Sequence, residues 1–161
     1  MMRNFDCAPT ILPEYPGLTI ESFSNSYSVF EDTNNLSLVT FMHYKDIHIV
    51  FPGDLECAGW MELLKNKAFV ENLKKVNFFV ASHHGRDSGY CESVFQLCNP
   101  EIIIISDESQ KYDTQKGVYN KTHSKGIVFG DTRRHVLTTR SDGMITIKQN
   151  QEDQHAWIKV G

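Results

Sequence analysis

The sequence predicts an α/β fold in which helices cover a largely parallel sheet. Residues 76–81 form an apolar run interrupted only by Asn77, and Ile102–Ile105 are four successive isoleucines. Such runs are typical of strands that are buried on both faces of a parallel sheet. A helical pattern lies between them, and this strand–helix–strand order is typical of a βαβ unit. With 161 residues, of which 40% are hydrophobic and 22% charged, the chain can form one sizeable core.

The amino-terminal part is predicted to begin with an irregular lead-in over residues 1–17, because three prolines and Gly17 interrupt it without periodicity. Residues 18–161 are predicted to form a single domain. Its first elements are a strand, a hairpin that turns at Lys45-Asp46, and two helices. The strands are expected at residues 18–23, 37–44 and 47–51, and the helices at 55–66 and 69–75.

The remainder is predicted to alternate strands and helices. Strands are expected at residues 76–81 and 101–105, with a helix at 88–98 between them, and the polar stretch 107–125 should contain a loop and one exposed helix. Residues 135–140 and 144–148 are predicted to form a hairpin, because Asp142-Gly143 between them is a strong hairpin signal. Residues 156–160 can add an edge strand.

Composition excludes some classes of function. A formal net charge of -4 argues against the broad basic surface that non-specific nucleic-acid binding requires. No apolar stretch is as long as the ~18 residues of a membrane span, and the first residues lack the apolar segment of a signal peptide. We therefore expect a cytoplasmic protein with no membrane contact.

The cysteines do not indicate a metal or disulfide framework. Cys7, Cys57, Cys91 and Cys98 form no Cys-x-x-Cys pair. They are expected to be buried or inert reduced thiols, and Cys91 and Cys98 are too far apart on one predicted helix, by about 10 Å of rise, to form a bridge.

Polar and metal-competent residues follow three predicted strands. Asp54 follows the strand at 47–51, His83 and His84 follow the strand at 76–81, and Ser106-Asp107 follows the isoleucines. Ligands of open parallel sheets bind in the crevice at the carboxyl ends of the strands, so these three loops are expected to converge on one site.

Asp54 has two interpretations. An Asp just before a helix is a favoured N-cap, whose carboxylate accepts hydrogen bonds from free backbone N–H groups. It can also be a carboxylate ligand of a metal, aimed into the crevice by the turn at Gly53.

His83 and His84 are the more informative feature, because two adjacent imidazoles after an apolar strand suit metal binding or general acid–base chemistry better than a plain loop. The other histidines are predicted to be structural. His43 and His48 lie in the hairpin strands and face a neighbour across the turn, whereas His123 on a solvent-facing helix, His135 at the start of a strand and His155 near the carboxyl end are each isolated.

Several of these segments together resemble a known family. They are Asn35 to Val39, the segment Phe51-Pro52-Gly53-Asp54-Leu55-Glu56, Ser82-His83-His84-Gly85, the strand ending at Ser106, and Thr138 to Gly143. From about Leu18 to Lys148 the chain resembles the carboxyl-terminal half of metallo-β-lactamase-fold hydrolases, in particular those similar to the soluble domain of the competence DNA-uptake channel.

The resemblance implies the second half of an αβ/βα sandwich that binds one or two ions of zinc or manganese and hydrolyses a phosphodiester or a related ester or amide. By the resemblance, Asp54 would bridge two metals, one histidine of His83-His84 would be a ligand, and the other would face the scissile group. Which histidine has which role stays open, and Ser106 and Asp107 would line the site.

The family's principal metal motif, His-x-His-x-Asp-His, has no counterpart in this chain. The chain is therefore a fragment, one half of a split enzyme, or a degenerate homologue, and a complementary amino-terminal half or a second copy is the expected partner. Nucleic acid is expected to contact the chain only as a substrate and not as a stable partner. A non-catalytic binding or assembly module that retains the half-fold is the alternative to a hydrolase.

Overall fold

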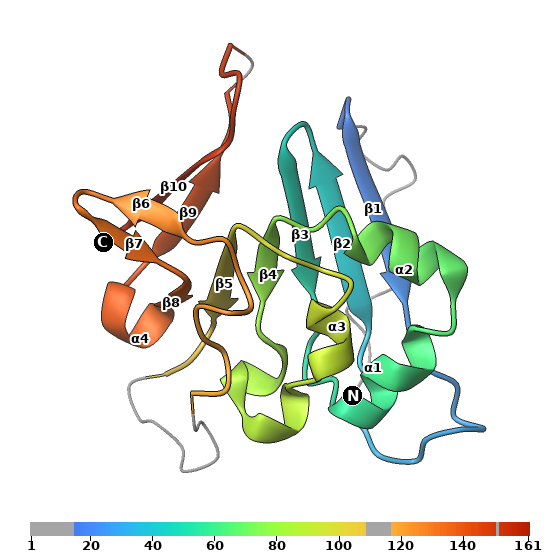
Figure 1. Cartoon of the computed structure of the whole chain (residues 1–161). Helices are drawn as coiled ribbons and strands as arrows, with labels where there is room; N and C mark the ends of the chain where they lie inside the picture. Colours follow the sequence, from blue (N-terminus) through green and yellow to red (C-terminus); the bar gives the residue numbers. More distant parts are fainter. Residues whose placement is uncertain (1–14, 109–116, 151) are drawn as a thin grey trace, which may run out of the picture.

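The computed structural model describes residues 15–108, 117–150 and 152–161 (Figure 1). Its main element is a six-stranded mixed sheet with the order β1-β2-β3-β4-β5-β8. The neighbouring pairs β1–β2 and β2–β3 are antiparallel, whereas β3, β4, β5 and β8 run parallel. The bounds are β1 Leu18–Phe23, β2 Val39–Tyr44, β3 Ile47–Phe51, β4 Phe78–Val80, β5 Ile102–Ile105 and β8 Val136–Thr138. The predicted α/β class is confirmed, and residues 1–14 of the predicted lead-in lie outside the described residues.

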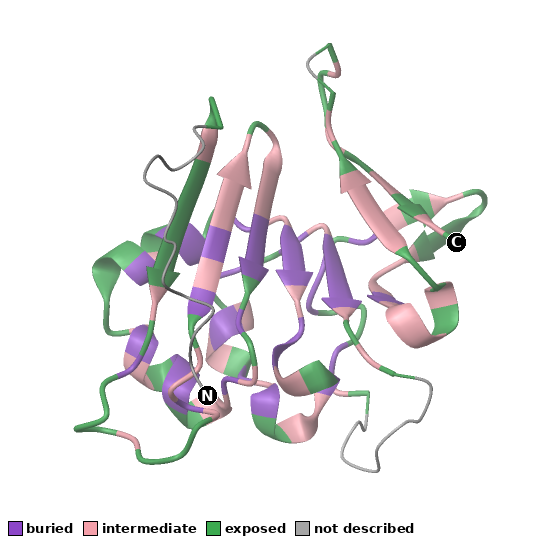
Figure 2. Cartoon of the chain, turned by 180° about the vertical axis from the view of Figure 1, so that it is seen from behind, coloured by how far each residue is buried: buried purple, intermediate pink, exposed green. Residues whose placement is uncertain are grey.

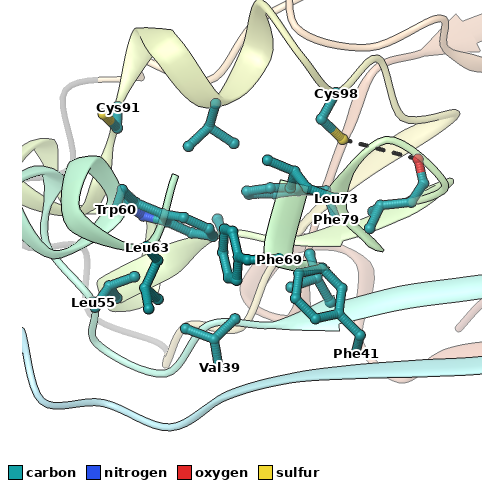
Figure 3. Packing of buried hydrophobic residues seen from close by; sticks show 14 of the residues in the cluster. Val39, Phe41, Leu55, Trp60, Leu63, Phe69, Leu73, Phe79, Cys91 and Cys98 are labelled. Carbon is teal, nitrogen blue, oxygen red and sulfur yellow. Dashed lines mark hydrogen bonds between the residues drawn. The ribbon is translucent and has the colours of Figure 1, made fainter. Parts of the chain in front are cut away.

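Helices cover one face of this sheet. The helices α1 (Cys57–Leu63), α2 (Lys67–Leu73) and α3 (Glu92–Phe95) lie in front of it in Figure 1 and behind it in Figure 2. Phe69 of α2 packs against Phe41 of β2 with ring centroids 5.2 Å apart, and Trp60 of α1 lies 6.0 Å from Phe79 of β4. These rings are fully buried and form the main core (Figure 3).

The second face of the sheet carries its own apolar cluster. In register across the strands lie Ile20, Met42, Ile49, Phe78 and Ile102, one from each of β1 to β5. Two short ribbons, β9 (Ile145–Lys148) with β10 (Trp157–Val160) and β6 (Ile127–Phe129) with β7 (Thr132–Arg134), contribute apolar residues to this cluster. The cover is uneven, because Ile102 is fully buried while Ile20 is 59% exposed.

The predicted helix at residues 88–98 is wrong over much of its length. The chain forms two 3₁₀ turns, η1 (Ser82–Gly85) and η2 (Asp87–Gly89), and then the short α3. Tyr90 and Cys91 are extended between η2 and α3. Gly89 packs so closely on the Ser82 carbonyl that a Cβ atom there would lie 2.6 Å from the oxygen. The close contact between Ser82 and Gly89 therefore forms where the first turns of the predicted helix were expected.

The predicted hairpin near the carboxyl end is also wrong. β8 pairs with β5, residues Thr139–Asp142 form the helical turn α4, and β9 pairs with β10. The Thr138 side chain caps this turn by accepting from the Ser141 N–H at 3.1 Å. Gly143, at φ 67°, ends the turn, so the Asp-Gly pair terminates a helix instead of connecting two paired strands.

Within residues 117–125, the described end of the stretch that was expected to hold an exposed helix, the chain forms turns and no helix. His123 is accordingly not on a solvent-facing helix. It is only 9% exposed, and its Nε2 lies 2.8 Å from the Tyr90 hydroxyl. Among the described residues, no helix is long and apolar enough to cross a membrane.

Candidate metal site

Asp54 and His84 meet at the carboxyl ends of two adjacent parallel strands. Asp54 follows β3 and His84 follows β4, and the Asp54 Oδ1 lies 3.5 Å from the His84 Nε2. Their side chains are 46% and 53% exposed, so both are accessible to a ligand. Asp54 does not cap α1, because Glu56 occupies the N-cap position and no side chain makes a cap hydrogen bond there. The capping interpretation is therefore wrong, and the carboxylate remains available at the strand end.

A backbone carbonyl fixes the tautomer of His84. The His84 Nδ1 lies 2.7 Å from the Ser106 carbonyl oxygen, which only accepts, so Nδ1 must bear the proton and donate. In the neutral ring, Nε2 is then an acceptor that faces the acceptor-only Asp54 carboxylate. Two lone pairs facing each other need either a second proton on the ring or a cation between them.

The separation suits a metal ion. A tetrahedral zinc ion with nitrogen and oxygen ligands at 2.0–2.2 Å sets them about 3.4 Å apart. A histidine that donates from Nδ1 to a carbonyl while Nε2 faces outward is also the usual arrangement of a metal-ligating histidine.

The loop that holds His84 has an unusual backbone. His83 (φ 50°, ψ 45°) and His84 (φ 54°, ψ 29°) are both in the left-handed region, and Gly85 follows at φ 75°. Such conformations cost about 1–2 kcal/mol per non-glycine residue. The loop is held by the fully buried Ser82, whose hydroxyl donates to the Leu55 carbonyl, and by the His83 N–H, which donates to the Gly53 carbonyl at 3.0 Å.

His83 lies on the other side of this turn and does not contact Asp54 among the interactions of the described residues. Its Nδ1 lies 3.0 Å from the Ser88 Oγ and 3.4 Å from the Glu56 Oε1. Its Nε2 lies 3.2 Å from the Arg86 guanidinium, which can only donate, so the ring is neutral with its proton on Nδ1. The side chain is 12% exposed. The structure thus brings Asp54 and His84 together and gives His83 different partners.

The loop after β5 orients His84 through the Ser106 carbonyl. Asp107, next along the chain, holds this loop against α4: its Oδ1 accepts from the Arg140 N–H at 3.1 Å, and its Oδ2 lies 3.0 Å from the Arg140 guanidinium. The Thr139 hydroxyl donates to the Asp107 carbonyl at 2.6 Å. Thr139 and Arg140 belong to the segment that resembles the family, but no function could be predicted for them from sequence, because only the pairing of β8 with β5 brings them to this loop.

An apolar groove opens on the Asp54–His84 pair. Its volume is about 550 Å³. Its apolar lining includes Met42, Ile49, Phe51, Val80, Ile104 and Ile147. Its polar end is formed by Asp54, His84, Ser106 and Thr139.

The donor set is small. Among the described residues no group of three or more His, Cys, Asp or Glu side chains could hold a metal ion. Asp54 and His84 thus offer two donor side chains, fewer than the about three protein ligands of a catalytic zinc.

The fold and this pair define an α/β protein with a two-ligand candidate metal site at the carboxyl ends of its parallel strands. Comparison of the chain with protein-family models, curated proteins and solved structures finds no match in any of the three.

Proposed function

We propose that the chain is the carboxyl-terminal half of a metallo-β-lactamase-like, metal-dependent hydrolase that acts on a phosphodiester or a related ester. The supporting observation is the Asp54–His84 pair, in which the His84 Nε2 faces the Asp54 carboxylate at 3.5 Å while the His84 Nδ1 donates to the Ser106 carbonyl. The order of the motifs along the chain, from Gly53-Asp54 to Ser82-His83-His84-Gly85, supports the family assignment.

In this function Asp54 and His84 would hold zinc or manganese, and the Ser106 carbonyl keeps the His84 Nε2 directed toward the Asp54 carboxylate. The metal, when bound, activates a water for hydrolysis. Ser82 and the Gly53 carbonyl fix the two loops to each other, which keeps the two ligands at a constant separation. The strained backbone at His84 is consistent with a functional position, where such strain is typically retained.

Metal titration of matched variants tests this proposal. We expect the chain to bind Zn²⁺ weakly by calorimetry, because a pair of ligands coordinates the ion incompletely. His84→Ala or Asp54→Asn should lower the affinity by at least tenfold. His155→Ala is the matched control, because His155 also lies beside a carboxylate, Asp46, at 3.1 Å but away from the groove. Equal losses in all three variants would refute the site.

The remaining ligands would come from a complementary half that contains His-x-His-x-Asp-His. Hydrolysis of a generic phosphodiester should be low for the chain alone and should rise when that half is added, in an Asp54-dependent way. Full Asp54-dependent turnover by this chain alone, with two tightly held metals, would contradict the half-site proposal.

A non-catalytic binding module is the second candidate function. It is favoured by the absence, among the described residues, of a three-ligand group and by the exposed apolar Ile20 on the β1 edge. If the complementary half binds the chain but restores no turnover, this candidate is the better one.

A further inference from the structure

The groove beside Asp54 and His84 has the features of a small-molecule site. Its volume of about 550 Å³ lies within the 300–1,000 Å³ of typical ligand pockets. Such pockets are mostly apolar and have a few polar groups that orient the ligand, and here the polar groups are gathered at the end where Asp54 and His84 lie.

The walls of the groove come from separate elements. Met42 and Ile49 belong to β2 and β3, Val80 and Ile104 to the ends of β4 and β5, and Ile147 to the β9 ribbon. Ile104 is 8% exposed and Ile49 is 5% exposed, whereas Phe51 at the rim is 42% exposed. The groove is therefore a recess with a buried floor and an accessible rim.

The charge of the lining selects against nucleic acid. Among the described residues that line the groove, only Asp54 and His84 can be charged, and none is Lys or Arg. The adjoining hollow, about 360 Å³, contains Arg86 but also Asp107 and Glu108. Nucleic-acid grooves need Lys and Arg side chains that neutralise successive phosphates. The groove beside Asp54 and His84 instead has an apolar lining, and the charged side chains at its polar end and in the adjoining hollow are mostly acidic.

We propose that the substrate is a small ester that carries a hydrocarbon group and no run of negative charges, with this group lying in the groove and the ester at Asp54 and His84. This assignment of substrate class rests on the proposed function. Burial of the hydrocarbon in the groove supplies the binding energy, because each methylene removed from water should tighten binding about fourfold.

Isoleucine-methyl NMR of the whole chain tests the groove directly. The probes are the methyl esters of butanoic, hexanoic and octanoic acid, added without metal and in the presence of a chelator. We expect shifts of the Ile104 and Ile147 methyls, with affinity rising with chain length. Ile103 is the internal control, because it is buried on the helix-covered face of the same strand. A single-stranded oligonucleotide should leave Ile104 and Ile147 unchanged.

A pair of exposed substitutions checks the location without disturbing the core. Phe51→Lys places a charge at the rim and should weaken octanoate-ester binding at least tenfold. Val128→Lys, at a 56% exposed position outside the groove, should leave it unchanged.

Several results would overturn the inference. These are affinity independent of chain length, equal shifts at Ile103, oligonucleotide binding in the groove, or loss of the ester-induced Ile104 and Ile147 shifts when a second 18.5 kDa copy or the complementary half associates with the chain. The failures of the two proposals are distinguishable. Chain-length-dependent binding without Asp54-dependent Zn²⁺ affinity would refute the metal site alone, whereas Asp54-dependent hydrolysis of phosphodiesters that lack hydrocarbon would refute the substrate class alone.

Discussion

At the scale of single residues, the two histidines after β4 have separate environments despite being adjacent. Their left-handed backbone turns one side chain to the accessible carboxylate of Asp54 and the other to Glu56 and Ser88. An extended continuation of the strand would also place them on opposite sides, because successive side chains of a strand alternate.

Replacing His84 should affect the Zn²⁺ affinity of the protein much more than its free energy of unfolding. Glycine adopts the left-handed conformation without steric cost, but the change also removes the hydrogen bond to the Ser106 carbonyl and gives the unfolded chain more freedom. His84→Gly should therefore change the free energy of unfolding by less than about 1 kcal/mol while it abolishes the contribution of this side chain to Zn²⁺ affinity. Urea denaturation and calorimetry measure the two effects. His83→Gly is the control and should be destabilising, because it removes the contacts of a nearly buried ring. Equal destabilisation by both changes would contradict this account.

The Arg134–Asp142 pair should make stability depend on acid. Hydrogen bonding to Arg134 lowers the pKa of the Asp142 carboxyl, whose side chain is 8% exposed. A carboxyl with a lowered folded-state pKa stabilises the fold above its unfolded pKa of about 3.9, and this stabilisation disappears as the pH falls through the folded value.

Asp142→Asn should therefore cost about 1–2 kcal/mol of unfolding free energy at pH 7 and progressively less below pH ~4. Denaturation curves across pH 2–7 measure this, and the exposed Asp131→Asn is the control. A pH-independent loss would exclude the ion pair as its cause.

At the scale of elements, a histidine pair joins β2 to β3 and to α2. The Asn72 amide nitrogen donates to Glu21 and to the Ala68 carbonyl, so its oxygen faces the His43 Nε2 at 2.8 Å and accepts. With the His43 proton on Nε2 and the ring uncharged, the His43 Nδ1 is an acceptor, to which the His48 Nδ1, 2.8 Å away, donates.

This arrangement predicts loss of stability in mild acid. Burial, with His43 and Lys75 nearby, lowers the pKa of His48 against a weaker opposite effect of Asp46. Below pH ~6.5 the unfolded chain binds a proton that the folded chain rejects, so the free energy of unfolding should fall from pH 7.5 to pH 5.5. His48→Asn should reduce that fall, and an unchanged slope would contradict the prediction.

Helix α1 is attached to the loop between β1 and β2 through the backbone of Gly59. Its N–H donates to the Asn35 side chain at 2.7 Å, and Asn25 donates to its carbonyl at 3.2 Å. A Cβ atom at Gly59 would lie 2.5 Å from both the Asn35 Oδ1 and the Leu55 Cδ1.

Gly59→Ala should therefore destabilise the protein by about 2 kcal/mol, through overpacking and the loss of these hydrogen bonds. Met61→Ala on the 47% exposed side of the same helix should change stability by less than about 0.5 kcal/mol. Thermal and urea denaturation compare the two, and similar small effects would show that the loop adapts.

How well the elements could be predicted depended on which contacts fix them. The strands β1 to β5 could be predicted because the apolar residues that indicate a strand lie within each strand itself. Asp54 and His84 could be placed together because the carboxyl ends of parallel strands meet at one edge of the sheet. The course of residues 82–91 depends on Gly89 packing on Ser82, and the pairing of β9 with β10 depends on the Thr138 cap of α4. Neither contact leaves a periodic pattern in the sequence. His83 was grouped with Asp54 because sequence spacing does not reveal the left-handed turn.

At the scale of the whole molecule, the two faces of the sheet are covered unequally. Aromatic residues of α1, α2 and β2 seal one face, whereas on the other Ile20 and Phe51 remain exposed. Figure 2 shows β1 exposed along most of its length. Strands β4 and β5 lie inside the sheet and are almost wholly buried, while β1 forms its edge.

Amide hydrogen exchange should follow this gradient. We expect the slowest exchange in β4 and β5, which should open only with global unfolding, and the fastest among the strands in β1 and in the β9–β10 ribbon. Mass spectrometry of exchanged peptides measures the order. Exchange in β1 as slow as in β5 would show that the open face is covered in solution.

The packing of Trp60 gives the protein an internal optical reporter. Its indole N–H donates to the Gly89 carbonyl at 3.2 Å, in the loop that continues from His83 and His84, and it is 1% exposed. The other tryptophan of the chain, Trp157, lies on β10 and is 40% exposed. A quencher dissolved in the buffer should therefore extinguish the Trp157 emission first. The remaining, blue-shifted emission should then respond to whatever moves the histidine loop, without any attached label.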